Sequence, residues 1–209
     1  MIKNHKKINI HKHTTEVVMN GIDIKKFLNY LFALYHVDTG ETELYRTWVQ
    51  KILWFTHWKF YRLYNEPFFC EDFESYKYGP VSWTVLKTQF FSLQTPKNTS
   101  YDLEDILDYH RNDIIDEFKS ILKNDFLADF GHDYGETFTK QQKIEAQEKR
   151  WDCFVFVFER LKKMRPNELM NLSYKQKSYK TALSNPTSKI ILNETILEDS
   201  EIDVLKNDF

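Results

Sequence analysis

The hydrophobic pattern of this chain is helical over most of its length. From Asp23 to about Gly40, apolar residues recur at spacings of three and four, the repeat of one helix face. A second helix is predicted from about residue 42 to about residue 65, where Asn65-Glu66-Pro67 ends it because proline cannot continue a helix. Aromatic residues surround the whole circumference of this second helix, so we expect it to lie at the centre of the core.

The segment from Phe73 to Val81 combines a turn signal with a cluster of aromatic residues. Gly79 can adopt backbone angles that other residues avoid, and Pro80 fixes its own φ near that of a first helical turn. We therefore predict an extended run that ends at Tyr78 and a helix that begins at Pro80. Residues 68–78 alternate weakly, and both a short hairpin and an extended loop agree with their pattern.

Helices are also predicted over the rest of the chain. Residues 154–158 alternate like a strand, but the length of their segment and its helical lead-in favour one long helix. The predicted helices run from Pro80 to about Leu93, from Asp102 to about Phe126 with an acidic exposed face, from 137 to 164, from Pro166 to Leu172, up to Asn185, and from Asn193 to Ile196.

Composition supports an all-α fold in one domain. Aromatic residues make up 16% of the 209 residues and there are only 5 glycines, which favours bulky helix packing over many short strands. Residues 1–20 hold several lysines and three histidines with almost nothing to bury, so they are predicted to form a mobile basic arm. Residues 21–209 are predicted to form a single compact multi-helix domain with a central aromatic helix.

Charge and cysteine content indicate which kinds of partner the protein could bind and in which cell compartment it would lie. The net charge is -2, so no overall field gathers nucleic acid or an anionic membrane. Cys70 and Cys153 cannot form a disulfide framework and indicate free thiols in a reducing cytosol. No apolar run resembles a signal peptide or a membrane span, so we expect a cytoplasmic protein.

The sequence holds no recognisable catalytic or metal-binding motif. His5, His11 and His13 do not share a helix face, and no acidic or cysteine ligand accompanies them. His57 on the aromatic helix is expected to be a hydrogen-bonded core residue, since no nucleophile is placed beside it. The sequence thus predicts no enzymatic activity, no cofactor and no metal site.

Two patterns of aromatic residues suggest binding. The run Trp58-Lys59-Phe60-Tyr61-Arg62 is compatible with stacking onto single-stranded nucleic acid, but a buried helix with extended cationic side chains explains it better. Tyr76, Tyr78 and Trp83, around Gly79 and Pro80, are candidate partner-binding residues, because exposed tyrosine and tryptophan often anchor protein interfaces. The alternative for this second group is simply a well-packed turn.

Three motifs in this order resemble those of a known family. Residues 48–55 (WVQKILWF) are similar to its LQKLLYF helix, residues 66–69 (EPFF) to KPLF, and residues 73–81 (FESYKYGPV) to IEAWKYGPV. Residues 172–182 resemble LSHxExxWxxA, with Tyr174 in place of the histidine and Tyr179 in place of the tryptophan. The family is that of the Panacea-domain, SocA-like antitoxins, which includes phage-associated GepA-like proteins.

The resemblance implies an all-helical cytosolic protein, encoded beside a toxin and often on a prophage or another mobile element. Members neutralise the toxin by direct protein binding, and one branch delivers it to a ClpXP-type protease. Combined with the residues, this predicts anchors at Tyr76, Tyr78 and Trp83, with the acidic face at 102–117 attracting a basic toxin surface. The alternatives are a nucleic-acid-binding regulator of a phage or mobile-element operon, acting through the basic arm, and a hydrolase using surface carboxylates.

Overall fold

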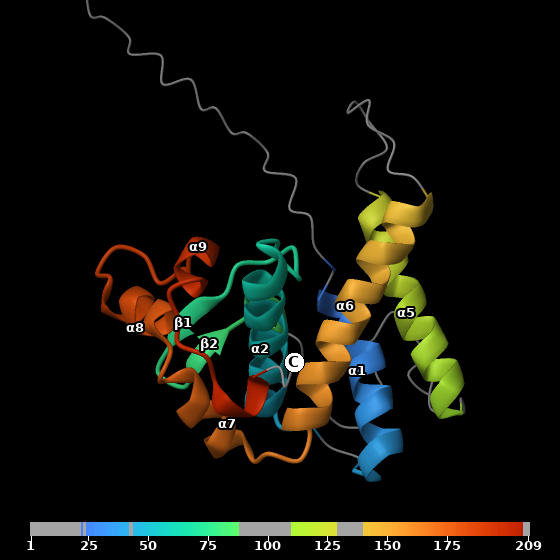
Figure 1. Cartoon of the computed structure of the whole chain (residues 1–209). Coiled ribbons are helices and arrows are strands. Elements are labelled where there is room, and N and C mark those ends of the chain that lie inside the picture. The colour runs from blue at the N-terminus through green and yellow to red at the C-terminus, as the bar shows by residue number, and fades with distance from the viewer. Residues whose placement is uncertain (1–21, 23, 42–43, 88–109, 129–139, 207–209) are drawn as a thin grey trace, which may run out of the picture.

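The computed structural model of the chain describes residues 22, 24–41, 44–87, 110–128 and 140–206. Helices make up most of this part, with one small sheet (Figure 1). The longer helices are α1 (Ile24–Thr39), α2 (Arg46–Tyr64), α5 (Arg111–Ala128) and α6 (Lys140–Leu161). The shorter elements are β1 (Glu74–Tyr76), β2 (Gly79–Val81), α3 (Trp83–Lys87), α7 (Pro166–Ser173), α8 (Lys177–Ser184), α9 (Asn193–Ile196) and a 3₁₀ turn at Asp203–Leu205. The predicted all-α class is confirmed, and the predicted basic arm at 1–20 lies outside the described residues.

Helix α2 is the centre of the molecule, as its aromatic pattern predicted. Every residue from Trp48 to Phe60 is buried, so this helix has no solvent-facing side over most of its length. It lies between α6 on one side and the hairpin with α7, α8 and α9 on the other (Figure 1). The buried stretch includes the polar side chains of Gln50, Lys51 and His57, whose hydrogen-bond partners lie outside α2.

Helices α1, α5 and α6 form the second layer, joined by aromatic rings. The ring centroids of Phe27 and Phe118 lie 4.7 Å apart, those of Phe27 and Phe154 lie 5.0 Å apart, and both pairs meet edge to face. All three rings are fully buried. Edge-to-face contacts add to the stability that burial of the ring area supplies, and they fix how the three helices cross.

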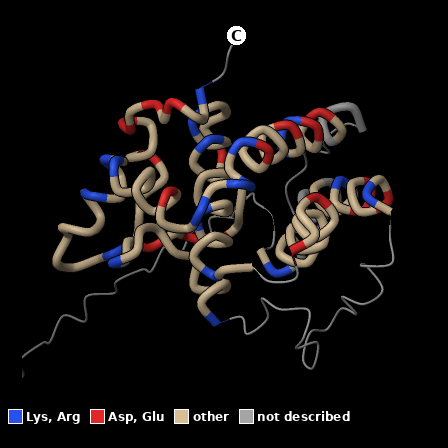
Figure 2. The backbone as a smooth tube through the Cα atoms, turned by 90° about the horizontal axis from the view of Figure 1, so that it is seen from below, with Lys and Arg blue, Asp and Glu red and all other residues tan. Residues whose placement is uncertain are grey.

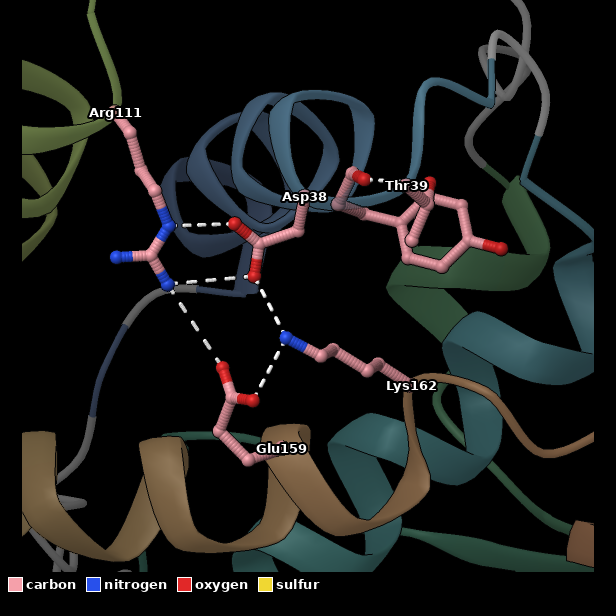
Figure 3. Close-up of polar contacts among 6 residues, drawn as sticks. Asp38, Thr39, Arg111, Glu159 and Lys162 are labelled. Atoms are coloured by element: carbon pink, nitrogen blue, oxygen red, sulfur yellow. Dashed lines mark hydrogen bonds and ion pairs between the residues drawn. The ribbon is translucent and has the colours of Figure 1, made fainter.

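An ion network joins the same three helices at one end (Figure 3). The Asp38 carboxylate is 6% exposed, receives a hydrogen bond from Arg111 Nε at 2.6 Å and forms an ion pair with Lys162 Nζ at 2.8 Å. Glu159 completes the network, 2.7 Å from Lys162 Nζ. Burial alone would raise the pKa of Asp38, but the hydrogen bonds from Arg111 and Lys162 outweigh it and lower the pKa. The carboxylate therefore stays ionised and links α1, α5 and α6.

The short sheet is an antiparallel hairpin, but it lies further along than the hairpin considered for residues 68–78: only β1 falls in that range, residues 68–73 belong to neither strand, and β2 follows at Gly79–Val81. Tyr76 pairs with Gly79, so Lys77 and Tyr78 form the two-residue turn. On its other side, β1 pairs with the chain near Ile190: Ser75 N donates to Lys189 O at 2.7 Å, and Ile191 N donates to Phe73 O at 2.8 Å. A segment more than a hundred residues downstream therefore supports the hairpin.

The prediction of a helix from Pro80 is wrong in its starting point. Pro80 lies in β2, and α3 begins only at Trp83. Ser82 is the residue that starts the helix, because its Oγ accepts a hydrogen bond from Val85 N at 3.2 Å, as an N-cap does. Glu71 Oε1 supports the same end by accepting from Thr84 N at 2.9 Å. The predicted continuation over 88–93 lies outside the described residues.

The other helix predictions agree with the structure, to within a few residues at the ends, wherever it describes the chain. Residues 154–158 are helical within α6, so the strand alternative is wrong. The predicted helices at Pro166–Leu172, up to Asn185 and at Asn193–Ile196 are confirmed within a residue or two as α7, α8 and α9. Residues 102–109 of the predicted acidic helix lie outside the described part, and α5 covers the rest.

The C-terminal segment closes over α2 through polar contacts. Trp54 Nε1 donates to Gln176 Oε1 at 2.5 Å, and Trp58 Nε1 donates to Asp199 Oδ2 at 2.9 Å. The other oxygen of the Asp199 carboxylate accepts from Ser178 N at 2.7 Å. Because both indole rings are fully buried, these acceptors satisfy N–H groups that water cannot reach.

Candidate functional site

The turn after β1 presents three aromatic side chains to solvent. Tyr78 at the tip is 56% exposed, and Tyr76 and Trp83 are each 39% exposed. The structure also brings two of them together, since the rings of Tyr76 and Trp83 meet edge to face with centroids 5.8 Å apart. We call Tyr76, Tyr78 and Trp83, with the hairpin that carries them, the aromatic turn. Gly79 and Pro80, the other two predicted site residues, are buried beneath it.

Lysine side chains lie against the aromatic turn. Lys77 Nζ is 5.3 Å from the centroid of the Tyr78 ring, and Lys87 Nζ is 5.8 Å from that of Trp83. A cation above a ring face is attracted by the negative charge there. The exposed surface thus combines aromatic residues, which are enriched at protein interfaces, with lysines of the kind found at their polar rim.

Gly79 is required at its position for two reasons. Its φ is +93°, which residues with a Cβ rarely adopt. A Cβ built there would also lie 2.5 Å from Ser173 Oγ and 2.7 Å from Lys51 Nζ. The predicted freedom of Gly79 is confirmed, and the structure adds that α2 and α7 approach its backbone too closely for any side chain.

Two adjacent polar residues of α2 bind the backbone of the aromatic turn from inside. Lys51 Nζ donates to Pro80 O at 2.8 Å. Gln50 Nε2 donates to Ser82 O at 2.9 Å, and its Oε1 accepts from Ser82 N at 2.7 Å. Our reading of the sequence missed both residues, although a polar pair inside an apolar helix is the signal that could have identified them.

Lys51 is a buried cation without a charged partner among the described residues. Its residue is 1% exposed, and burial lowers the pKa of its amine to about 7. In the neutral form the amine still carries hydrogens, so it can donate to Pro80 O in either protonation state. The contact to the turn therefore does not require the charge.

Two tyrosines hold the aromatic turn from the α7–α8 side. Tyr179 OH donates to Tyr76 O at 2.8 Å, and Tyr174 OH donates to Lys77 O at 3.0 Å. Their rings stack on each other with centroids 5.7 Å apart. Tyr179 is only 3% exposed, whereas Tyr174 is half-buried. Both are positions at which the sequence departs from the family motif that it resembles.

His57 is a structural residue, as the sequence suggested. Its Nε2 lies 2.9 Å from Asn193 Oδ1, and its Nδ1 accepts from Phe69 N at 3.4 Å. Burial lowers the pKa of the imidazole to about 4, against the opposing hydrogen bond to Asn193. With both nitrogens engaged and the ring neutral, His57 has no nitrogen left to act as a general base.

The remaining candidate chemistry does not converge on a second site in the described part of the chain. Trp58 is fully buried and Lys59 is 3% exposed, so this helix cannot stack bases, and the buried-helix interpretation is confirmed. Within the same residues, no three His, Cys, Asp or Glu side chains are grouped closely enough to hold a metal ion. No described helix combines the length and hydropathy needed to cross a membrane.

The acidic residues of α5 do not border the aromatic turn. Asp113, Asp116 and Glu117 are exposed, but α5 and the hairpin lie on opposite sides of the molecule (Figure 1). Figure 2 shows basic and acidic positions interspersed along the described chain instead of gathered into separate fields. The predicted acidic segment 102–108 lies outside the described residues.

Comparison with known proteins adds one finding. A family model described as "Antitoxin SocA-like, Panacea domain" matches residues 49–180, more than half of the chain. The matched span contains Gln50, Lys51, the whole aromatic turn, Tyr174 and Tyr179. No curated protein and no solved structure matches the chain significantly.

Proposed function

The chain belongs to the SocA-like antitoxin family with a Panacea domain, and we propose on this premise that it neutralises a co-encoded protein toxin by binding it directly. Family membership supports a role in a toxin–antitoxin system in general. Our proposal adds that residues 21–209 act in the cytoplasm as one domain, by binding and without catalysis. The aromatic turn is its proposed contact surface.

One observation carries the proposal: the aromatic turn is exposed while its backbone is held by side chains. Tyrosine and tryptophan supply a large contact area with few rotatable bonds, so little conformational entropy is lost when they are buried against a partner. Tyr78, at 56% exposure, has the most area still to bury among the three aromatic side chains. A few such anchors usually contribute most of the free energy of binding.

The family allows two outcomes after binding. In the first, the complex itself blocks the toxin. In the second, the antitoxin acts as an adaptor that delivers the toxin to a ClpXP-type protease. Both need a contact surface, so the proposal for the aromatic turn is the same in each. Toxin lifetime separates them, because only the adaptor mechanism shortens it.

The proposal is tested by expressing the adjacent reading frame with and without this gene and scoring growth. We expect the adjacent product to arrest growth alone and this chain to restore it. A complex of the two purified proteins should survive 0.5 M salt, since apolar burial is not screened by ions. Arrest without rescue, or rescue without a complex, would contradict direct neutralisation.

Side-chain truncation then tests the aromatic turn itself. Tyr78→Ala and Trp83→Ala should each weaken toxin binding by about 2 kcal/mol, or roughly thirtyfold, as at interface hot spots. Tyr45→Ala is the matched control, because Tyr45 is 70% exposed and lies outside the turn. If all three variants bind alike while their unfolding temperatures match, the turn is not the interface.

The alternative function, a nucleic-acid-binding regulator of a phage or mobile-element operon, has a distinct signature. Lysine contacts to phosphates release counterions, so retention of operon DNA would fall steeply between 50 and 200 mM salt. The lysines that would make these contacts lie in residues 1–20, outside the described part of the chain. Salt-sensitive DNA binding that is lost on deletion of residues 1–20, without toxin capture, would favour this alternative.

A further inference from the structure

We propose that Tyr179 and Tyr174 on one side, and Gln50 and Lys51 on the other, are positioning residues that set the aromatic turn in its toxin-binding conformation before the toxin arrives. This inference rests on the proposed function and gives these residues a role in holding the turn, not in touching the toxin. Buried Tyr179 is the clearest case, since a partner cannot touch a side chain that is 3% exposed.

The turn needs external support because it is too short to be stable alone. Each strand has three residues, and two-stranded hairpins are at best marginally stable in water without further packing. Only three residue pairs face each other across the two strands, so the ladder supplies few hydrogen bonds. Whatever fixes the positions of Tyr76 and Tyr78 must therefore come from neighbouring elements.

Four side chains supply that support through backbone carbonyls around the turn. The phenols of Tyr179 and Tyr174 donate to two consecutive carbonyls, those of Tyr76 and Lys77. On the other strand, Lys51 donates to the carbonyl of Pro80. Gln50 then pairs with both backbone groups of Ser82, in the manner of an adjacent strand. The turn is thus bound before, within and after its two central residues.

The two halves of this support act at different places. Gln50 and Lys51 project from the buried part of α2, so they join β2 to the core. Tyr174 follows the end of α7 and Tyr179 lies in α8. Their hydroxyl groups join this segment to Tyr76, at the end of β1, and to Lys77 in the turn. Because Tyr76 and Tyr78 lie on the half held by the phenols, loss of a phenol should loosen these anchors first.

A loosened turn should bind more weakly for an entropic reason. A partner must immobilise every anchor that is not already fixed, and that cost is subtracted from the binding free energy. Tyr76 O is part-buried, so water replaces the Tyr179 phenol poorly there, whereas Lys77 O is exposed and water can take the place of Tyr174 OH. The Tyr179 phenol should therefore matter more than that of Tyr174.

Deleting single phenol oxygens tests the proposal with minimal change of shape. In Tyr179→Phe the amide hydrogens of residues 77–79 should exchange at least about fivefold faster, and affinity for the adjacent-frame product should fall about fivefold to tenfold. Tyr174→Phe should change both quantities in the same direction by less. Tyr61→Phe is the control, because its ring packs against the core from α2 and away from the turn.

Each result decides for or against positioning. Faster exchange together with weaker binding supports it. Unchanged exchange, or faster exchange with unchanged affinity, overturns it even when Tyr78→Ala shows that the turn is the interface. If Tyr78→Ala has no effect on affinity, the proposed contact surface fails and the positioning role fails with it. Should Tyr179→Phe lower the unfolding temperature greatly, Tyr174→Phe, at a more exposed site, supplies the same comparison in a folded protein.

Discussion

Lys51 illustrates how a single buried residue can make the stability of the whole protein depend on pH. The pKa of its amine is about 7 in the folded protein against 10.5 in water, and desolvation by burial is the cause. Below pH 7 the amine is charged in the folded and in the unfolded protein, so folding carries the full cost of burying the charge. Between pH 7 and 10.5 the unfolded chain binds more protons than the folded one, so the free energy of unfolding rises with pH.

The corresponding prediction compares Lys51→Met with the unchanged protein. From pH 7 to pH 9, the stability of the unchanged protein relative to the variant should increase by about 2 kcal/mol, because each pH unit above the folded pKa contributes up to about 1.4 kcal/mol. Urea unfolding at pH 7, 8 and 9 measures this difference. A difference that does not change with pH would mean that the amine keeps its charge when buried.

Gly79 and Gly40 form a natural pair for separating backbone strain from steric overlap. Both have positive φ, +93° and +73°, but a Cβ at Gly40 would have nothing within 4 Å. Gly40→Ala should therefore cost only about 1 kcal/mol, the price of a left-handed backbone. Gly79→Ala should cost about 3 kcal/mol or more, since Lys51 and Ser173 must also move. Chemical denaturation of both variants gives the comparison, and equal losses would show that the surroundings of Gly79 yield.

For single residues, the sequence predicted local backbone conformation better than contacts with other parts of the chain. The unusual backbone of Gly79 follows from its place before proline in a turn, because that is a local property. The contacts from Lys51 and Ser173 depend on how α2 and α7 cross, and no spacing in the chain encodes that crossing. In the sequence, Tyr174 and Tyr179 stand out only as departures from the family motif. The structure shows that both side chains donate hydrogen bonds to the turn.

At the scale of elements, the ion network of Asp38 joins α1, α5 and α6 at one end, in addition to their aromatic packing. Asp38→Asn removes the charge that Arg111 and Lys162 share, and should lower the free energy of unfolding by about 1 to 3 kcal/mol at pH 7. The pKa of Asp38 is lowered on folding, so the contribution is complete above its ordinary value of 3.8 and is lost as pH falls through the lowered value.

The matched control for this network is Asp203→Asn. Asp203 pairs with Lys206 at 2.6 Å, but its side chain is 93% exposed, so the loss of stability should be much smaller than for Asp38→Asn. Guanidinium chloride would screen both contacts, and urea is therefore the denaturant of choice. Similar losses in the two variants would show that the Asp38 network is no stronger than a surface ion pair.

The periodicity of apolar residues is enough to predict most helices, since each helix buries a continuous stripe of its surface.

The prediction fails at β2, because Pro80 is also a typical first residue of a helix. Proline is also tolerated at the edge of a sheet, and here its carbonyl faces Lys51 while its missing N–H leaves no donor unsatisfied on that side. The helix starts at Ser82, a residue type that is common at the N-cap, and this signal could have placed the start correctly.

At the scale of the whole molecule, the exposed acidic residues of α5 lie on the side opposite the aromatic turn (Figure 1). The Debye length is about 8 Å at physiological salt, so charges on α5 are screened from a toxin bound at the hairpin. Replacing Asp113, Asp116 and Glu117 with Asn, Asn and Gln should then change the association rate by less than about twofold at 0.15 M salt. Surface plasmon resonance measures this rate, and a larger fall would indicate a toxin that reaches α5.

Non-local pairing is what the sequence could not reveal at this scale. The support of β1 by residues near Ile190, and of α2 by Gln176 and Asp199, joins segments far apart along the chain. Such contacts leave no periodic trace, because each segment contributes only one or two residues. The aromatic composition of α2 indicated that something must cover it, and only the structure shows that the C-terminal segment does so.

This closure has a consequence for the order of folding. The acceptors that bind His57, Trp58 and Arg62 belong to Asn193, Ile196, Asp199 and Glu201, between 134 and 141 residues further along the chain. Closing loops of that length costs entropy before any of these contacts forms, so they should form late. The buried polar groups of α2 should therefore stay hydrated until the last step of folding.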